Sequence, residues 1–155
     1  EKSFEGYSTD PKKIKKKWNN FSKQVSDEVG VLIKNIKPIN SSPIFETIQL
    51  VHITELKDFE TNVNEIIILS DMIQHTNPGL SMYSHNVPVF SNFSKGEYFS
   101  KIHTNFNENV DVTLHVLRRD QHRVFQQSQE FQYFWSTFFV KGLKSRNYKI
   151  KFVDG

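Results

Sequence analysis

An acid that follows an apolar, β-branched run is the residue of this sequence best placed to do chemistry. Residues 65–71 are Glu-Ile-Ile-Ile-Leu-Ser-Asp. Such a run is typical of a strand buried on both faces of a parallel sheet. In open α/β sheets, ligands bind just beyond the carboxyl ends of the strands. Asp71 is therefore a candidate ligand-binding residue, although a strand-end Asp also commonly caps the next turn.

A pair of serines upstream of this strand could supply hydroxyl groups to the same site. Residues 40–47 predict a loop that leads into a helix, with Ser41 or Ser42 as N-cap and Pro43 at the first helical position. A serine can cap a helix and bind a ligand at the same time. Together with Asp71, these residues predict a hydroxyl-and-carboxylate site at one rim of a sheet.

Basic residues and a histidine are predicted to lie at the same rim. A basic group follows a second predicted strand and could contact an acidic partner or a phosphate; it comprises Arg118, Arg119, His122 and Arg123. His75 is four residues after Asp71, but residues 77–79, Asn-Pro-Gly, indicate a loop rather than a helix there. We therefore treat Arg118, Arg119 and His75 as candidate partner-binding residues. No histidine has a second ligand at a spacing typical of a metal site.

The composition limits the classes of protein that are possible. A chain of 155 residues with 37% hydrophobic and 24% charged residues fits one globular domain covering 1–155. The absence of Cys excludes disulfides, thiolate metal sites and cysteine nucleophiles. No apolar stretch approaches the roughly 20 residues that span a bilayer. The net charge of +3 is mild, and its lysines at 12–17 favour a solvated helix face over a nucleic-acid site.

The order of predicted elements indicates the fold class. Hydrophobic periodicity predicts helices at 10–34, 43–57, 95–106 and 120–141, and strands at 65–70, 110–117 and 148–153. Strands that alternate with helices imply parallel pairing through right-handed crossovers. The prediction is an α/β fold: a Rossmann-like open parallel sheet with helices on both faces. The aromatic residues of the last helix are expected in its core rather than stacked on nucleic-acid bases.

Three segments occur in order: the loop-to-helix passage 41–46, Ser-Ser-Pro-Ile-Phe-Glu, the strand end 68–72, Ile-Leu-Ser-Asp-Met, and the later strand that runs into 117–119, Leu-Arg-Arg. Together they resemble the second half of a von Willebrand factor A-like domain. The sequence more closely resembles a bacterial group of A-like proteins with "SpI", "SDM" and "fW…ff…G" motifs in this order. The matching segments here are 42–44, Ser-Pro-Ile, 70–72, Ser-Asp-Met, and 134–142, Phe-Trp-Ser-Thr-Phe-Phe-Val-Lys-Gly. The resemblance covers about residues 10–153 and implies A-like topology for the sheet.

The resemblance also implies an incomplete metal-ion-dependent adhesion site. Ser41 or Ser42 would be the hydroxyl of the family's second metal loop, and Asp71 the carboxylate of its third. The first loop, Asp-x-Ser-x-Ser, has no counterpart in the 155 residues. Since Mg²⁺ takes about six oxygen ligands, we expect Mg²⁺ or Mn²⁺ binding only in a longer form that contains this loop, and none by this chain alone.

The opening strands of an A-like sheet are missing as well. Without them, the strand at 65–70 would expose a hydrogen-bonding edge and apolar faces, which native proteins avoid. Either the strands lie upstream, which the start at Glu1 rather than Met favours, or another chain supplies them.

These observations predict a non-enzymatic protein-interaction module. Its binding rim would comprise the 40–43 loop, the 71–90 loop and the start of the helix after Leu117, and an acidic partner could complete a metal's ligand shell. The alternative is a metal-dependent phosphodiesterase or nuclease-type enzyme that uses Asp71 with histidines, for which the sequence offers no clear second acid. A structural subunit that has lost its site is a third hypothesis. Bacterial cytoplasm and periplasm both remain open.

Overall fold

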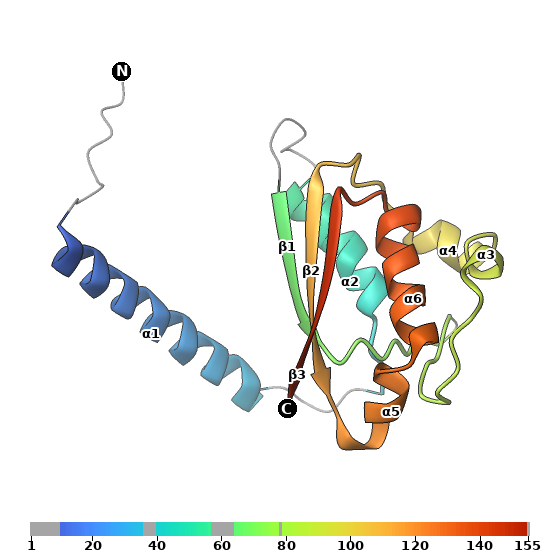
Figure 1. Cartoon of the computed structure of the whole chain (residues 1–155), viewed down its shortest axis with the longest axis horizontal. Helices are drawn as coiled ribbons and strands as arrows, with labels where there is room; N and C mark the ends of the chain where they lie inside the picture. Colours follow the sequence, from blue (N-terminus) through green and yellow to red (C-terminus); the bar gives the residue numbers. More distant parts are fainter. Residues whose placement is uncertain (1–9, 36–39, 57–63, 78, 155) are drawn as a thin grey trace. The chain divides into compact units, whose positions relative to one another are not determined.

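The chain divides into two units, which are described separately. The computed structural model describes residues 10–35, 40–56, 64–77 and 79–154. The units comprise residues 1–39 and 40–155, so a single domain over 1–155 stays a prediction. In the first unit, helix α1 spans Pro11–Asn35 and confirms the helix predicted there (Figure 1). The Asp10 carboxylate caps it by accepting a hydrogen bond of 2.9 Å from the Lys12 amide.

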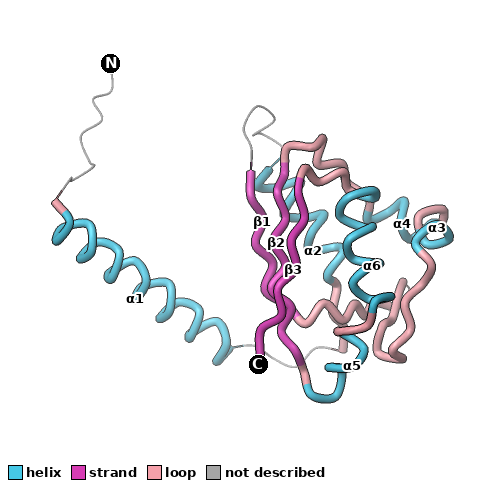
Figure 2. The backbone as a smooth tube through the Cα atoms, in the orientation of Figure 1, coloured by secondary structure: helices cyan, strands magenta, loops and turns pink. Residues whose placement is uncertain are grey.

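The second unit contains a parallel three-stranded sheet, as predicted. Its strands are β1 (Asn64–Ser70), β2 (Val110–Arg118) and β3 (Asn147–Asp154). They pair in the order β1-β2-β3, and both pairings are parallel (Figure 2). The unit is therefore an α/β structure built on an open parallel sheet, and Asp71 directly follows the carboxyl end of β1.

Within the described residues of the second unit, burial of the sheet is one-sided, which corrects one expectation. Helices α2 and α6 lie on the same side of the sheet (Figure 2), and helices on both faces stay a prediction. Strand β1 is not buried on both faces, because Ile67 and Leu69 are 64% and 65% exposed. The register aligns Ile67 with Lys149 and Leu69 with Lys151 across β2, so this outer face meets solvent.

The helices of the second unit are shorter than the sequence predicts. The single helix expected at 120–141 is broken at Ser128, which is extended and accepts a hydrogen bond from the Phe131 amide as a new N-cap. The helix expected at 43–57 continues to Leu56 as a π-helical turn, and Lys57 lies outside the described residues. The elements are α2 (Ile44–Val51), η1 (His52–Leu56), α3 (Phe90–Phe93), α4 (Glu97–Ile102), η2 (Asp120–His122), α5 (Arg123–Gln126), α6 (Gln129–Thr137) and η3 (Phe138–Gly142).

An aromatic layer between the sheet and its helices forms the core. The Phe45 ring centroid lies 5.0 Å from that of Trp135 and 4.7 Å from that of Phe138. All three side chains are buried, which confirms the core prediction for the late aromatic residues. No helix in the described parts of the chain is long and apolar enough to cross a membrane.

Replacing the central tryptophan should destabilise the second unit strongly. Trp135→Ala leaves a large cavity in a fully buried site, so we expect a loss of about 3–5 kcal/mol in the free energy of unfolding, measured by denaturant titration. Tyr133→Ala is the control, because this residue of α6 is 65% exposed and its loss should change stability by less than about 0.5 kcal/mol. Equal effects of the two substitutions would contradict the core assignment.

Candidate functional site at the carboxyl ends of the strands

A tightly fixed turn follows β1 and holds Asp71. The Ser70 hydroxyl accepts a hydrogen bond from the Met72 amide at 3.0 Å, and Asp71 Oδ1 accepts one from the Ile73 amide at 3.1 Å. Between them, the fully buried Met72 has a φ of 57°, in the left-handed region that non-glycine residues rarely adopt. Such a residue persists only where its surroundings fix it, and it often marks a functional segment.

Gln126 of α5 ties this turn to the end of β2. Its Nε2 donates to the backbone carbonyls of Asp71 at 2.8 Å and Leu117 at 2.9 Å, and its Oε1 accepts from the Arg119 amide at 3.0 Å. The side chain is fully buried, and both ends of its amide are hydrogen-bonded. The sequence analysis missed this residue, because a glutamine within an amphipathic pattern carries no signal for such a role.

Asp71 acts as a turn cap and also as an ion-pair partner. Its Oδ2 lies 2.8 Å from Arg119 Nε, while its side chain is nearly buried and that of Arg119 is 56% exposed. The structure thus brings together two predicted site residues from different groups, the metal candidate Asp71 and the partner-binding candidate Arg119. It also confirms the turn-capping interpretation of Asp71.

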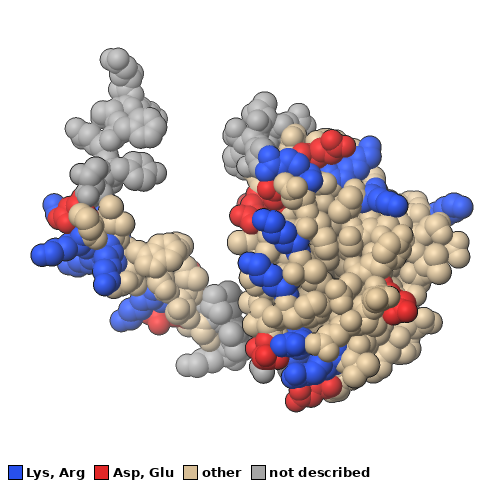
Figure 3. Space-filling model, in the orientation of Figure 1, with Lys and Arg blue, Asp and Glu red and all other residues tan. Residues whose placement is uncertain are grey.

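The arginines of the rim are balanced by carboxylates. Arg118 pairs with Asp154 at 2.6 Å, and Arg123 lies 3.0 Å from Asp120 and 3.7 Å from Asp154. Figure 3 shows acidic and basic side chains next to one another at this end of the second unit. Because each charge has an opposite neighbour, the electrostatic reason for an acidic partner is weaker than the sequence alone indicates.

The two serines do not cap α2, which corrects that prediction. The N-cap residue is Pro43, one position later than expected, and no side chain of the cap residue binds the helix. Instead, Gln74 Oε1 accepts hydrogen bonds from the Ile44 and Phe45 amides at 2.7 and 3.1 Å. Ser42 forms a backbone bridge with His75, in which each amide donates to the other's carbonyl, and Ser41 is exposed.

A histidine–tyrosine cluster lies beside the Asp71 turn; it comprises His75, Tyr83, His85 and His122. His85 Nε2 lies 2.7 Å from His122 Nδ1, so one nitrogen donates and the other accepts. The centroid of the Tyr83 ring lies 5.0 Å from that of His75 and 5.8 Å from that of His122. His85, like Met72, has a left-handed backbone, with φ 56°. Of these four residues, the sequence indicated His75 as a partner-binding candidate and His122 as a member of the basic group at the rim.

The surroundings of His122 favour its neutral imidazole. Burial lowers the pKa of His122 below its ordinary value of 6.5, and the nearby His85 lowers it further, against a smaller opposing effect of Asp71. Among the residues that the structure describes, no three His, Asp or Glu side chains are grouped so as to hold a metal ion. The rim therefore offers a fixed guanidinium, aromatic surface and imidazoles rather than a set of metal ligands.

Comparisons with protein-family models, with curated proteins and with solved structures find no match for this chain. The von Willebrand A-like resemblance therefore stays a prediction.

The lowered pKa of His122 makes the stability of the rim depend on pH. As the pH falls through 6.5, the unfolded chain binds a proton before folded His122 does, so folding stability decreases until the folded pKa is passed. We expect the ring NMR signals of His122 to titrate with a midpoint below 6.5. His85→Gln should raise that midpoint, because it removes the electrostatic effect of His85 that lowers the pKa of His122; a midpoint at or above 6.5 in the unmodified protein would contradict this account.

Proposed function

We propose that residues 40–155 form a non-enzymatic protein-interaction module of von Willebrand A-like topology that binds a protein partner at its rim. The observation that carries the proposal is the turn at Ser70–Ile73, in which Met72 has a left-handed backbone and two side chains accept backbone hydrogen bonds; this turn fixes Asp71 and so orients the half-exposed Arg119. A side chain that is held before binding loses less entropy on association.

The residue types exposed at the rim also suit a protein interface. Arginine and tyrosine contribute binding energy more often than other residues, and Arg119, Tyr83 and the apolar Val124 are all exposed. The balanced ion pairs favour a partner of mixed polarity, while an acidic partner remains an alternative for the exposed part of Arg119.

The phosphodiesterase alternative has less support. An enzyme of that type needs a carboxylate that is free to bind a metal or a proton, whereas one oxygen of Asp71 pairs with Arg119 and the other accepts a backbone hydrogen bond. The imidazole of His122, which lies near enough to Asp71 for their charges to interact, is hydrogen-bonded to that of His85.

We infer that a further apolar strand pairs with β1 in the functional protein. Strand β1 is an edge of the described sheet, and its outer face carries the exposed Ile67 and Leu69. The other edge strand, β3, carries Lys149 and Lys151 in the same rows and is suited to water. Of the two sources considered, another chain or an upstream segment, the A-like topology favours the upstream segment.

The described residues do not fit a divalent cation by themselves. Asp71 is the one carboxylate among the three candidate metal ligands, and Arg119 already neutralises it. Ser42 is engaged through its backbone with His75, and Ser41 is exposed.

Calorimetry should therefore detect no Mg²⁺ or Mn²⁺ binding by this chain in the low-millimolar range, because two hydroxyls and one ion-paired carboxylate supply too few oxygens. A form with an upstream strand and its Asp-x-Ser-x-Ser loop should bind weakly, and Asp71→Ala should abolish that binding. Tight binding by the present chain would instead favour the enzyme alternative.

Loss of Arg119 should weaken partner binding. A photo-reactive amino acid placed at the exposed position 83 can capture the partner in source cells, and mass spectrometry can identify it. With the purified partner, Arg119→Ala should raise the Kd by about tenfold or more.

Arg146→Ala is the matched control for that measurement. It removes the same charge and a similar ion pair, with Asp111 at 2.6 Å, but at the amino ends of the strands. Its Kd should stay near that of the unmodified protein, and thermal unfolding of both variants checks that each is folded. Equal effects of the two variants, or none from Arg119→Ala, would refute the proposed interface.

A further inference from the structure

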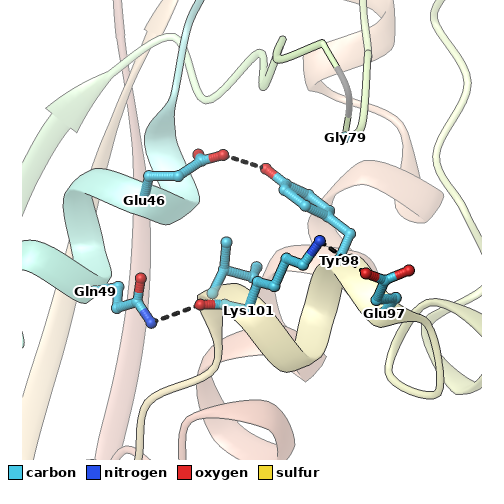
Figure 4. A pocket seen from close by; sticks show the side chains of 7 residues that line it. Glu46, Gln49, Gly79, Glu97, Tyr98 and Lys101 are labelled. Atoms are coloured by element: carbon cyan, nitrogen blue, oxygen red, sulfur yellow. Dashed lines mark hydrogen bonds and ion pairs between the residues drawn. The ribbon is translucent and has the colours of Figure 1, made fainter.

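A pocket of about 430 Å³ opens between α2 and α4 and is separate in its lining from the rim residues discussed above. Its volume falls within the range of roughly 300–1,000 Å³ that is typical of small-molecule sites. Figure 4 shows that Glu46 and Gln49 of α2 face Tyr98 and Lys101 of α4 across it. The lining comprises Glu46, Gln49, Gly79, Glu97, Tyr98, Lys101 and Ile102.

Among the residues that the structure describes, only uncharged groups donate hydrogen bonds to the Glu46 carboxylate. Its Oε1 accepts a hydrogen bond of 2.7 Å from the Tyr98 hydroxyl, and its Oε2 accepts one of 3.3 Å from Gln74 Nε2. Burial raises the pKa of Tyr98 far above its ordinary value of 10.0, so the phenol keeps the proton that it donates. A half-buried carboxylate without a cationic neighbour favours the binding of a positive charge.

The cation at the pocket mouth does not supply that charge. Lys101 Nζ lies 2.8 Å from Glu97, one turn earlier on α4, and the two side chains are 68% and 83% exposed. Figure 4 shows this pair directed toward one another, with Glu46 bonded to Tyr98 instead. Of the two lining carboxylates, Glu97 is therefore balanced and Glu46 is not.

Gln49 adds a second acceptor on the same face of α2. It lies three residues after Glu46, a spacing that places two side chains side by side on a helix. Its Nε2 donates to the Lys101 carbonyl at 2.8 Å, which fixes the amide and leaves Oε1 available. In Figure 4 this oxygen lies on the side of the amide that faces Glu46.

Apolar groups and a close backbone contact shape the rest of the pocket. The Tyr98 ring and Ile102 supply apolar surface. A Cβ at Gly79 would lie 2.4 Å from Thr76 Oγ1 and 3.1 Å from the Tyr98 ring, so the loop can approach the ring this closely only with glycine. A side chain at position 79 would therefore clash with this wall of the pocket.

We propose that this pocket binds a small organic cation with a primary ammonium group. The ammonium donates hydrogen bonds to the Glu46 carboxylate and to Gln49 Oε1, and the alkyl part of the ligand packs on Tyr98 and Ile102. An ammonium has three donors and no acceptor, which matches two fixed acceptors and one bond to water. This inference does not depend on the proposed interaction at the rim.

Butylammonium chloride tests the proposal as a probe, in a ¹H–¹⁵N NMR titration of the whole 155-residue chain. We expect saturable shifts at the amides of Glu46, Gln49, Gly79, Tyr98 and Lys101. Butanol and sodium butyrate, which have the same chain length but no positive charge, should produce no saturable shifts there. Saturable binding of butanol with equal affinity would mean that the pocket is a simple apolar cavity and would overturn the proposal.

Substitutions separate the role of charge from that of structure. Glu46→Gln keeps an acceptor for Tyr98 but removes the charge, and should weaken butylammonium binding at least about tenfold. Glu130→Gln is the matched control, because this exposed carboxylate of α6 does not line the pocket; it should leave the affinity within about twofold. Gln49→Leu leaves Glu46 in place and should also weaken binding, which keeps the test decisive if the Glu46→Gln variant unfolds. Absence of saturable shifts, or an equal loss in the Glu46 and Glu130 variants, would refute the site.

Discussion

The one-sided burial of a three-stranded parallel sheet is the constraint on which the second unit depends. Strand β2 has hydrogen-bonded neighbours on both sides, and its inner residues Val112, Leu114 and Val116 are almost fully buried. They face the aromatic layer, in which Phe45 from α2 contacts Trp135 and Phe138. Because apolar burial is the main favourable term in folding, this single layer positions α2 and α6, and therefore the loops that lead to the rim and the pocket.

Two buried glutamines connect this core to the loops at the surface by hydrogen bonds. Gln126 joins the ends of β1 and β2 and fixes the Asp71 turn. Gln74 caps α2 with its oxygen, while its nitrogen lies within hydrogen-bonding distance of both Glu46 and Tyr98. An unsatisfied buried amide costs about 1–3 kcal/mol, so each glutamine favours one arrangement of its loop. Gln126 thus helps to define the shape of the rim, and Gln74 that of the pocket between α2 and α4.

The sequence predicts features that depend on local pattern and misses those that depend on distant contacts. The β-branched runs and their spacing predict the three parallel strands and the position of Asp71, and the aromatic spacing predicts a buried Trp135. The break at Ser128 was missed because the apolar period continues across it. The cap of α2 was misassigned because Gln74, far along the chain, takes the place of a local serine. Exposure of Ile67 was missed because an apolar run looks the same whether or not a neighbouring strand covers it.

The two edge strands of the sheet differ in the side chains of their outer faces, and this difference bears on the position of the rim. Lysines line β3 there, whereas exposed isoleucine and leucine lie on β1, so apolar surface is concentrated beside an open hydrogen-bonding edge. A strand added to that edge would satisfy the backbone groups of β1 and would move β1 from the edge toward the middle of the sheet. Asp71 and Arg119 would then lie near the centre of the rim, where open α/β sheets bind their ligands. Because Asp71 is already neutralised by Arg119, the group presented at that centre is a guanidinium, which suits recognition of a protein surface better than coordination of a cation.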